Sequence, residues 1–120
     1  METVLWYLGR LLFGGYFIYN GINHLSHLGL MAGYAKSKGV PSATAAVTFT
    51  GLLLIIGGAS VLLDFYATIG VIALVLFLLP VTFKMHQFWT IQDPMAKMGE
   101  TVNFTKNLAL LGAVLILLSR

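Results

Sequence analysis

Polar side chains recur at helical spacing inside stretches of this chain that are otherwise apolar. They are amides, imidazoles, an ammonium and an indole: Asn20, Asn23, His24, His86, Trp89, Lys106 and Asn107. The amides, imidazoles and ammonium donate hydrogen bonds, and the indole offers a ring face. Such donors at the end of an apolar slot are what the carbonyl groups of a quinone or a similar amphiphile need. We therefore predict one ligand-binding site built from these residues.

The histidines raise a second possibility, the ligation of a metal or a haem. His24 and His27, with His86 from another part of the chain, could supply three imidazoles. Their positions argue against this, because they lie near the ends of apolar stretches and no carboxylate is expected on their faces. We expect no metal site, disfavour haem and assign the histidines to hydrogen bonding.

Several other chemistries are excluded by composition and motif. The chain has no cysteine, which excludes disulfides, thiolate nucleophiles and cysteine-held iron–sulfur clusters. The motifs of nucleotide-binding and hydrolytic enzymes are absent. The basic residues form no run typical of nucleic-acid binding. The residues alone therefore identify no catalytic group.

Four apolar stretches carry the polar residues. They cover residues 4–23, 43–62, 66–84 and 102–119, each close to the ~20 residues that cross a bilayer core. Hydrophobic residues make up 58% of the chain and charged residues 9%, a balance typical of membrane proteins. Backbone groups in lipid must be paired internally, which predicts helices. The predicted fold is all-α, a four-helix transmembrane bundle that forms a single domain over residues 1–120 in a lipid bilayer.

The basic residues indicate the orientation of these spans. Five lysines fall in or beside the two long loops, and two arginines fall on the other side: Lys36, Lys38, Lys84, Lys97 and Lys106 against Arg10 and Arg120. Cytoplasmic loops carry an excess of basic residues. We predict a multi-pass protein of the cytoplasmic membrane with both long loops in the cytoplasm, so that the polar residues lie in the cytoplasmic half.

Local signals predict how the spans connect and pack. Residues 25–42 suit either a short interfacial helix or an irregular loop, with Ser42 or Thr44 capping the next span. Glycines on the first two spans predict these as the closest helix pair: Gly14, Gly21, Gly51, Gly57 and Gly58. The short connection around Asp64 predicts a tight hairpin. Arg10 suits either a structural ion pair with Asp64 or a contact with substrate.

Several runs of residues resemble the DoxX family. They are YAKSKGVP at residues 34–41, the glycine-containing segment 51–58, MHQFW at residues 85–89 followed by Asp93-Pro94, and NFTKNLALLG at residues 103–112. The Gly9-Arg10 pair and residues 20–24 also resemble the family pattern, so the resemblance covers essentially the whole chain. One difference concerns the second span, where many members carry an acidic residue early on and this chain has Val47, Thr48 and Thr50.

The resemblance implies a small four-helix membrane protein. The name-giving members of the family are described as membrane subunits of a thiosulfate:quinone oxidoreductase or a terminal quinol oxidase, which implies a quinone and a partner subunit. A homo-oligomer is an alternative to that partner. A non-enzymatic membrane assembly, chaperone-like or lipid-binding protein stays open as a second class, and a small-solute transporter as a third. Whether the chain itself catalyses a reaction stays open at this level.

Overall fold

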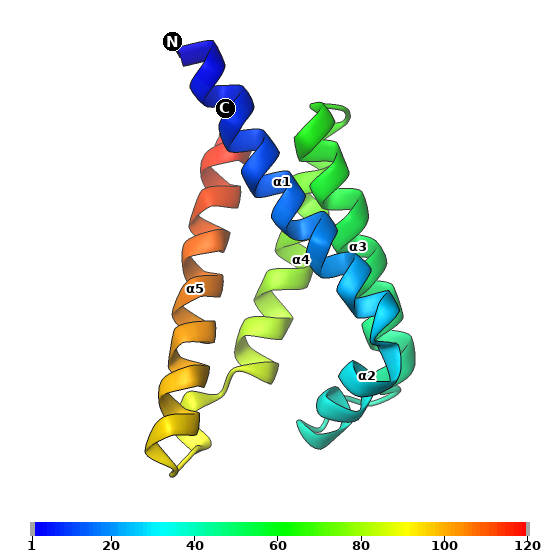
Figure 1. The fold of residues 1–120 in the computed structure, drawn as a ribbon, viewed down its shortest axis with the longest axis vertical. Helices are drawn as coiled ribbons and strands as arrows, with labels where there is room; N and C mark the ends of the chain where they lie inside the picture. The colour runs from blue at the N-terminus through cyan, green and yellow to red at the C-terminus, as the bar shows by residue number, and fades with distance from the viewer. Residues whose placement is uncertain (1, 120) are drawn as a thin grey trace. The chain divides into compact units, whose positions relative to one another are not determined.

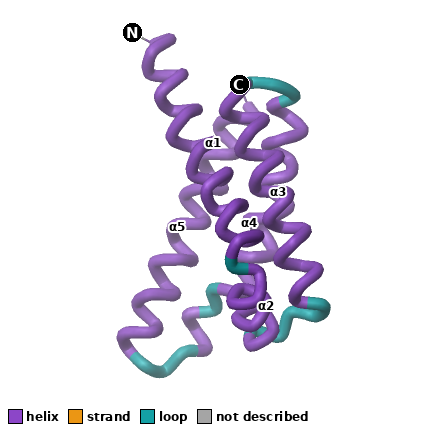
Figure 2. Tube along the Cα trace, turned by 45° about the vertical axis from the view of Figure 1, so that its right-hand side comes forward, coloured by secondary structure: helices purple, strands orange, loops and turns teal. Residues whose placement is uncertain are grey.

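The computed structural model describes residues 2–119, and these residues are almost entirely helical (Figure 1). The elements are α1 (Glu2–Ser26), α2 (Leu28–Ser37), α3 (Ala43–Leu63), α4 (Ala67–Met85), the short 3₁₀ helix η1 (Phe88–Thr90) and α5 (Pro94–Ser119). Short loops connect them (Figure 2), and no strand occurs among the described residues. The predicted all-α class is confirmed.

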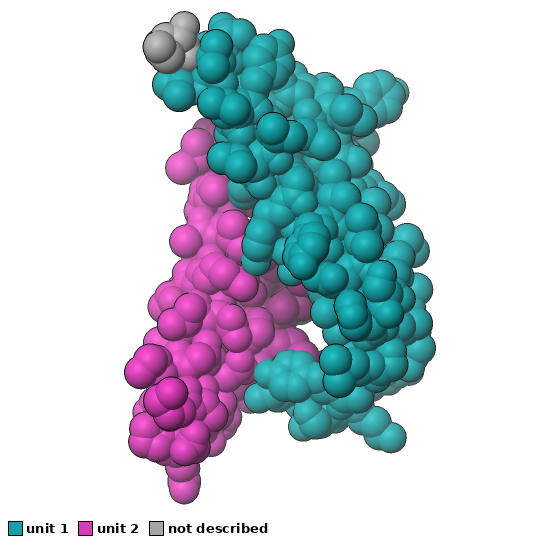
Figure 3. Space-filling model, viewed as in Figure 1, with its two compact units in different colours: residues 1–74 teal, residues 75–120 magenta. Residues whose placement is uncertain are grey.

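The chain divides into two compact units, residues 1–74 and residues 75–120 (Figure 3). The division falls inside α4, whose first turns belong to the first unit and whose last turns belong to the second. The single domain predicted over residues 1–120 stays a prediction.

Three helical segments are long and apolar enough to cross a bilayer. They are Ala43–Leu63, Ala67–Thr90 and Pro94–Ser119. The first predicted span lies within α1, which is long enough but is not among these segments, because Arg10, its asparagines and its tyrosines lower its mean hydropathy. That α1 also crosses the membrane stays a prediction.

The helix boundaries match the predicted spans except at the start of α5. This helix begins at Pro94, whereas the apolar pattern predicted a start at residue 102. The prediction was wrong because the first two turns of α5 include Lys97, Gly99 and Glu100, which interrupt the apolar run by which the span was identified. The predicted tight hairpin between α3 and α4 is confirmed, with Asp64 and Tyr66 at positive φ and the Phe65 N–H donating to the Ser60 carbonyl at 3.1 Å.

In residues 1–74, α1 and α3 pack closely at paired glycines. A Cβ added at Gly14 would lie 2.7 Å from the Gly58 carbonyl oxygen, and one added at Gly21 would lie 2.7 Å from the Gly51 carbonyl oxygen. The pairs run in opposite directions along the two helices, so the helices are antiparallel. Only glycine allows backbones to approach this closely. The predicted close packing of these two spans is confirmed for this unit.

The loop after α1 contains the short helix α2, so the predicted helix in this segment is confirmed, while its position in the membrane interface stays a prediction. Its Ala32 and Ala35 are buried, and the helix lies against α3. The predicted capping of α3 by Ser42 or Thr44 is wrong. Ser42 occupies the N-cap position with its backbone in the left-handed region and makes no side-chain capping bond, while Thr44 lies inside the helix.

Candidate functional site

An aromatic cluster joins α4, η1 and α5 within residues 75–120. Phe104 on α5 makes edge contacts with three rings, at centroid distances of 5.5 Å to Phe83, 5.3 Å to Phe88 and 5.7 Å to Trp89. Each such pair is worth about 0.5–1.5 kcal/mol beyond simple burial. The cluster therefore holds the end of α4 and the connecting residues against α5.

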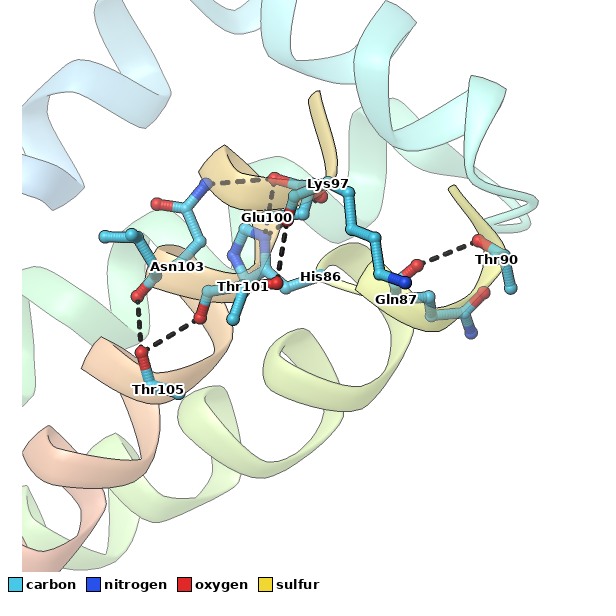
Figure 4. A network of polar contacts seen from close by, with 9 residues as sticks. His86, Gln87, Thr90, Lys97, Glu100, Thr101, Asn103 and Thr105 are labelled. Carbon is cyan, nitrogen blue, oxygen red and sulfur yellow. Dashed lines mark hydrogen bonds and ion pairs between the residues drawn. The ribbon is translucent and has the colours of Figure 1, made fainter. Parts of the chain in front are cut away.

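A polar contact lies near the Phe83–Phe104 pair, between the residue that follows α4 and the second turn of α5. His86 Nδ1 lies 3.4 Å from Glu100 Oε1 and 3.5 Å from Oε2 (Figure 4). These separations exceed the ~2.9 Å of an optimal N–H···O bond, so the hydrogen bond is weak. Attraction between opposite charges adds to it when His86 is protonated. The Asn103 amide donates a shorter bond, 2.9 Å, to Glu100 Oε1.

This group of His86, Glu100 and Asn103 is partly buried. The side chain of His86 is 16% exposed and that of Glu100 is 12% exposed. A charged pair with this exposure is screened less by salt than one on an open surface, yet it still reaches solvent or a ligand. The arrangement suits a group that exchanges protons with a neighbouring molecule.

Asp93 and Pro94 determine where α5 begins and therefore where Glu100 lies. The Ala96 N–H donates to Asp93 Oδ2 at 2.9 Å, and the Lys97 N–H donates to the Asp93 carbonyl at 2.8 Å. An aspartate at the N-cap followed by proline at the first helical position favours a helix start. Glu100 consequently lies on the second turn of α5, beside the end of α4.

The expectation that no carboxylate lies beside the histidines is wrong for His86. It followed from the later start assigned to the last helix, which left Glu100 in a loop. The sequence does contain the signal that identifies Glu100, because Asp93-Pro94 is a helix-start pattern and Glu100 and Asn103 are three residues apart on one helical face.

The other predicted site residues of this unit lie in different environments. Trp89 is exposed and belongs to the aromatic cluster. Asn107 is buried, with 6% of its surface exposed, whereas Lys106 is exposed. Lys106 and Asn107 therefore differ in exposure, because consecutive residues on a helix are rotated by about 100°.

Two of the predicted site residues of the first unit, Asn20 and His24, bond within their own helix. The Asn20 amide donates to the Tyr16 carbonyl at 2.8 Å, and His24 Nδ1 lies 2.9 Å from the Asn20 carbonyl oxygen. Asn23 is half-buried. His24 also packs over Gly51, where an added Cβ would lie 2.9 Å from His24 Cβ. These three residues belong to residues 1–74, so one site shared with the second unit stays a prediction.

Arg10 interacts with the end of α3. Its Nε donates to the Val61 carbonyl at 2.9 Å, and its Nη2 donates to the Leu62 carbonyl at 2.8 Å. The residue is 8% exposed. The last carbonyls of a helix lack partners inside the helix and carry partial negative charge, so Arg10 stabilises this terminus. The guanidinium bonds to backbone oxygens rather than to the Asp64 carboxylate, and the predicted ion pair stays a prediction.

Comparison with known proteins identifies a family. The DoxX family model matches residues 5–87, which include α1 to α4 and His86. The match ends before α5, so the run at residues 103–112 lies outside it. No curated protein and no solved structure matches the chain. With its apolar helices and a match over more than half of its length, this chain belongs to the DoxX family of membrane proteins.

Proposed function

We propose that this DoxX-family protein is a membrane subunit that binds a quinone, or an amphiphile with the same head-group chemistry, for an oxidoreductase system. The observation that supports it most is the partly buried pair of His86 and Glu100 beside the aromatic cluster around Phe104. A quinone head needs a hydrogen-bond donor for its carbonyl and ring faces for its plane. The His86 imidazole is such a donor, and the rings around Phe104 lie about one helical turn from it.

The His86–Glu100 pair supplies the proton chemistry. Reduction of a quinone to a quinol consumes two electrons and two protons. His86 Nδ1 faces the carboxylate, so Nε2 is the nitrogen that exchanges a proton with the ligand, and Glu100 stabilises the imidazolium. Asn103 donates to Glu100 and keeps the carboxylate oriented. The ligand's apolar tail extends along the apolar surface of the helices.

The electrons come from a partner subunit. The chain contains no cysteine for thiol or iron–sulfur electron transfer, so it binds the quinone while another protein delivers the electrons. The subunit belongs to the cytoplasmic membrane, and its two long loops lie in the cytoplasm. The quinone site therefore takes its protons from the cytoplasm. Lys36 and Lys38 at the end of α2 suit this side, because they can lie near anionic headgroups.

Gentle purification followed by organic extraction tests the proposal. The absorption spectrum of the extract is expected to show about one quinone per chain, and His86→Leu is expected to lose most of it. Thr105→Val is the matched control, because Thr105 is exposed on α5 and its hydroxyl bonds only to its own helix, at Thr101 and Val102. The control should retain quinone at the level of the parent protein.

The same extraction distinguishes the competing function. An extract that contains only phospholipid, in equal amounts from the parent and His86→Leu, would contradict quinone binding. It would instead favour a lipid-binding or assembly protein.

A further inference from the structure

Two buried polar side chains lie on α4 and α5 near the His86 group. Thr82 lies on α4, four residues before His86, which follows the end of that helix, and Asn107 follows Asn103 by four residues on α5. Thr82 is 2% exposed and Asn107 is 6% exposed. Neither side chain makes a hydrogen bond within residues 2–119. Both therefore keep hydrogen-bonding capacity that the chain does not use.

Other threonines within the helices do make such bonds. The hydroxyls of Thr48, Thr50, Thr101 and Thr105 donate to the backbone carbonyl four residues earlier, at 2.7–2.9 Å. The Asn20 amide does the same in α1. Thr82 and Asn107 have the same option and do not take it. Their polar atoms are thus available to a group from outside the chain.

The polar atoms are also reachable. Among the described residues, no side-chain nitrogen or oxygen is both fully enclosed and unbonded. The small exposed part of Thr82 and Asn107 therefore includes their polar atoms. An unpartnered amide or hydroxyl in an apolar surrounding is unfavourable, which favours occupation by a ligand atom that can hydrogen-bond.

We infer that Thr82 and Asn107 form a second hydrogen-bonding position for the ligand of the His86 site, which makes that ligand a para-quinone bound at both carbonyls. The inference rests on the proposed function and specifies it. His86 donates to one carbonyl, and the Asn107 amide, with the Thr82 hydroxyl, donates to the other. The ring lies between them, on the face that carries Phe104.

The spacing supports a ligand with two carbonyls. His86 lies opposite Glu100, and Asn107 follows Glu100 by seven residues on α5, a rise of about 10 Å. Hydrogen bonds of about 2.8 Å at both carbonyl oxygens of a benzoquinone place its two donors at a similar separation. An amphiphile with a single polar head would use the His86 end and leave Asn107 without a partner, and an anionic head would be repelled by Glu100.

The test compares two ligands with the same decyl tail, one a 1,4-benzoquinone and the other a benzaldehyde with a single carbonyl. Calorimetric titration of the purified protein in nanodiscs measures both affinities. Asn107→Leu and Thr82→Val are each expected to weaken quinone binding about fivefold, the equivalent of one hydrogen bond of about 1 kcal/mol. Benzaldehyde affinity should stay unchanged, and Thr105→Val should alter neither.

Each outcome decides the inference. Thr82→Val is nearly isosteric, so it keeps the test valid if Asn107→Leu folds poorly. Equal losses for both ligands, or no loss for the quinone, would overturn the second position while leaving quinone binding at His86 intact. Failure of the parent protein to bind the quinone at all would overturn the proposed function and this inference together.

Discussion

His86 and Glu100, fourteen residues apart in sequence, meet at 3.4 Å between Nδ1 and Oε1. The contact connects the end of α4 to the second turn of α5, and Phe83 and Phe104 connect the same helices one turn away. A titratable pair beside ring faces suits the proposed quinone site. The position of this pair depends on the helix start at Asp93.

Replacing Gly14 with alanine is expected to destabilise the unit formed by residues 1–74. The new Cβ would lie 2.7 Å from the Gly58 carbonyl oxygen, a backbone atom that can move only if the helices separate. Overpacking of this kind costs about 1–3 kcal/mol. Thermal unfolding of the purified protein measures the effect. Gly15→Ala is the adjacent control, because nothing lies within 4 Å of its added Cβ, and it should be neutral or stabilising by up to about 1 kcal/mol.

Arg10→Met and Lys106→Met are expected to fail in different ways. Removing the guanidinium leaves the Val61 and Leu62 carbonyls without their donors, and hydrogen bonds to charged groups are worth about 1.5–3 kcal/mol each. Arg10→Met should therefore mainly lower the folded yield. Lys106 is exposed, so Lys106→Met should leave the folded yield nearly intact. It should lower quinone retention, because it removes the ammonium that the sequence predicts as a hydrogen-bond donor to the ligand. The opposite ordering would place the functional site near Arg10.

Asp93→Ala should weaken the start of α5 by about 1 kcal/mol, because the Ala96 N–H loses its carboxylate acceptor. Since this cap positions Glu100, we also expect reduced quinone retention. Asp93→Asn should preserve both properties, because asparagine caps as well as aspartate. Hydrogen exchange of the first turn of α5 provides the measurement, and equal exchange in all three proteins would contradict this role of Asp93.

The cytoplasmic location of both long loops can be tested on a chain that has no cysteine of its own. A single cysteine placed at Ser37 should resist an impermeant thiol reagent in intact cells and react after the cells are opened. A cysteine at Asp64 should react in intact cells. Labelling of the Ser37 position in intact cells would reverse the predicted topology.

Much of the fold could be predicted from the sequence, because the local composition of a chain identifies its helical membrane segments. Apolar runs identified α3 and α4 closely, and the glycines on α1 and α3 identified the tightest helix pair. Both signals act over short distances, either along one helix or between small residues that permit close approach. The hairpin at Asp64 followed from the brevity of its loop.

The candidate site was predicted less completely. His86 and Trp89 were identified by type, but Glu100 was missed because the polar start of α5 does not look like a membrane span. Whether Glu100 contacts His86 depends on where α5 begins, because the cap at Asp93 places Glu100 on a helical face rather than in a loop. The bonds of Arg10 to the carbonyls of Val61 and Leu62 carry no sequence signal, because every residue has such a carbonyl.

The most direct test of quinone binding beside His86 is photolabelling with an azido-substituted quinone, followed by mass spectrometry of the digested protein. We predict modification within residues 83–89 or 100–107, and competition by excess unlabelled decylubiquinone should abolish it. Trp6, the other tryptophan of the chain, lies in α1 and should not be labelled. Competed labelling confined to α1 or α3, or labelling that excess quinone does not reduce, would contradict the site proposed here.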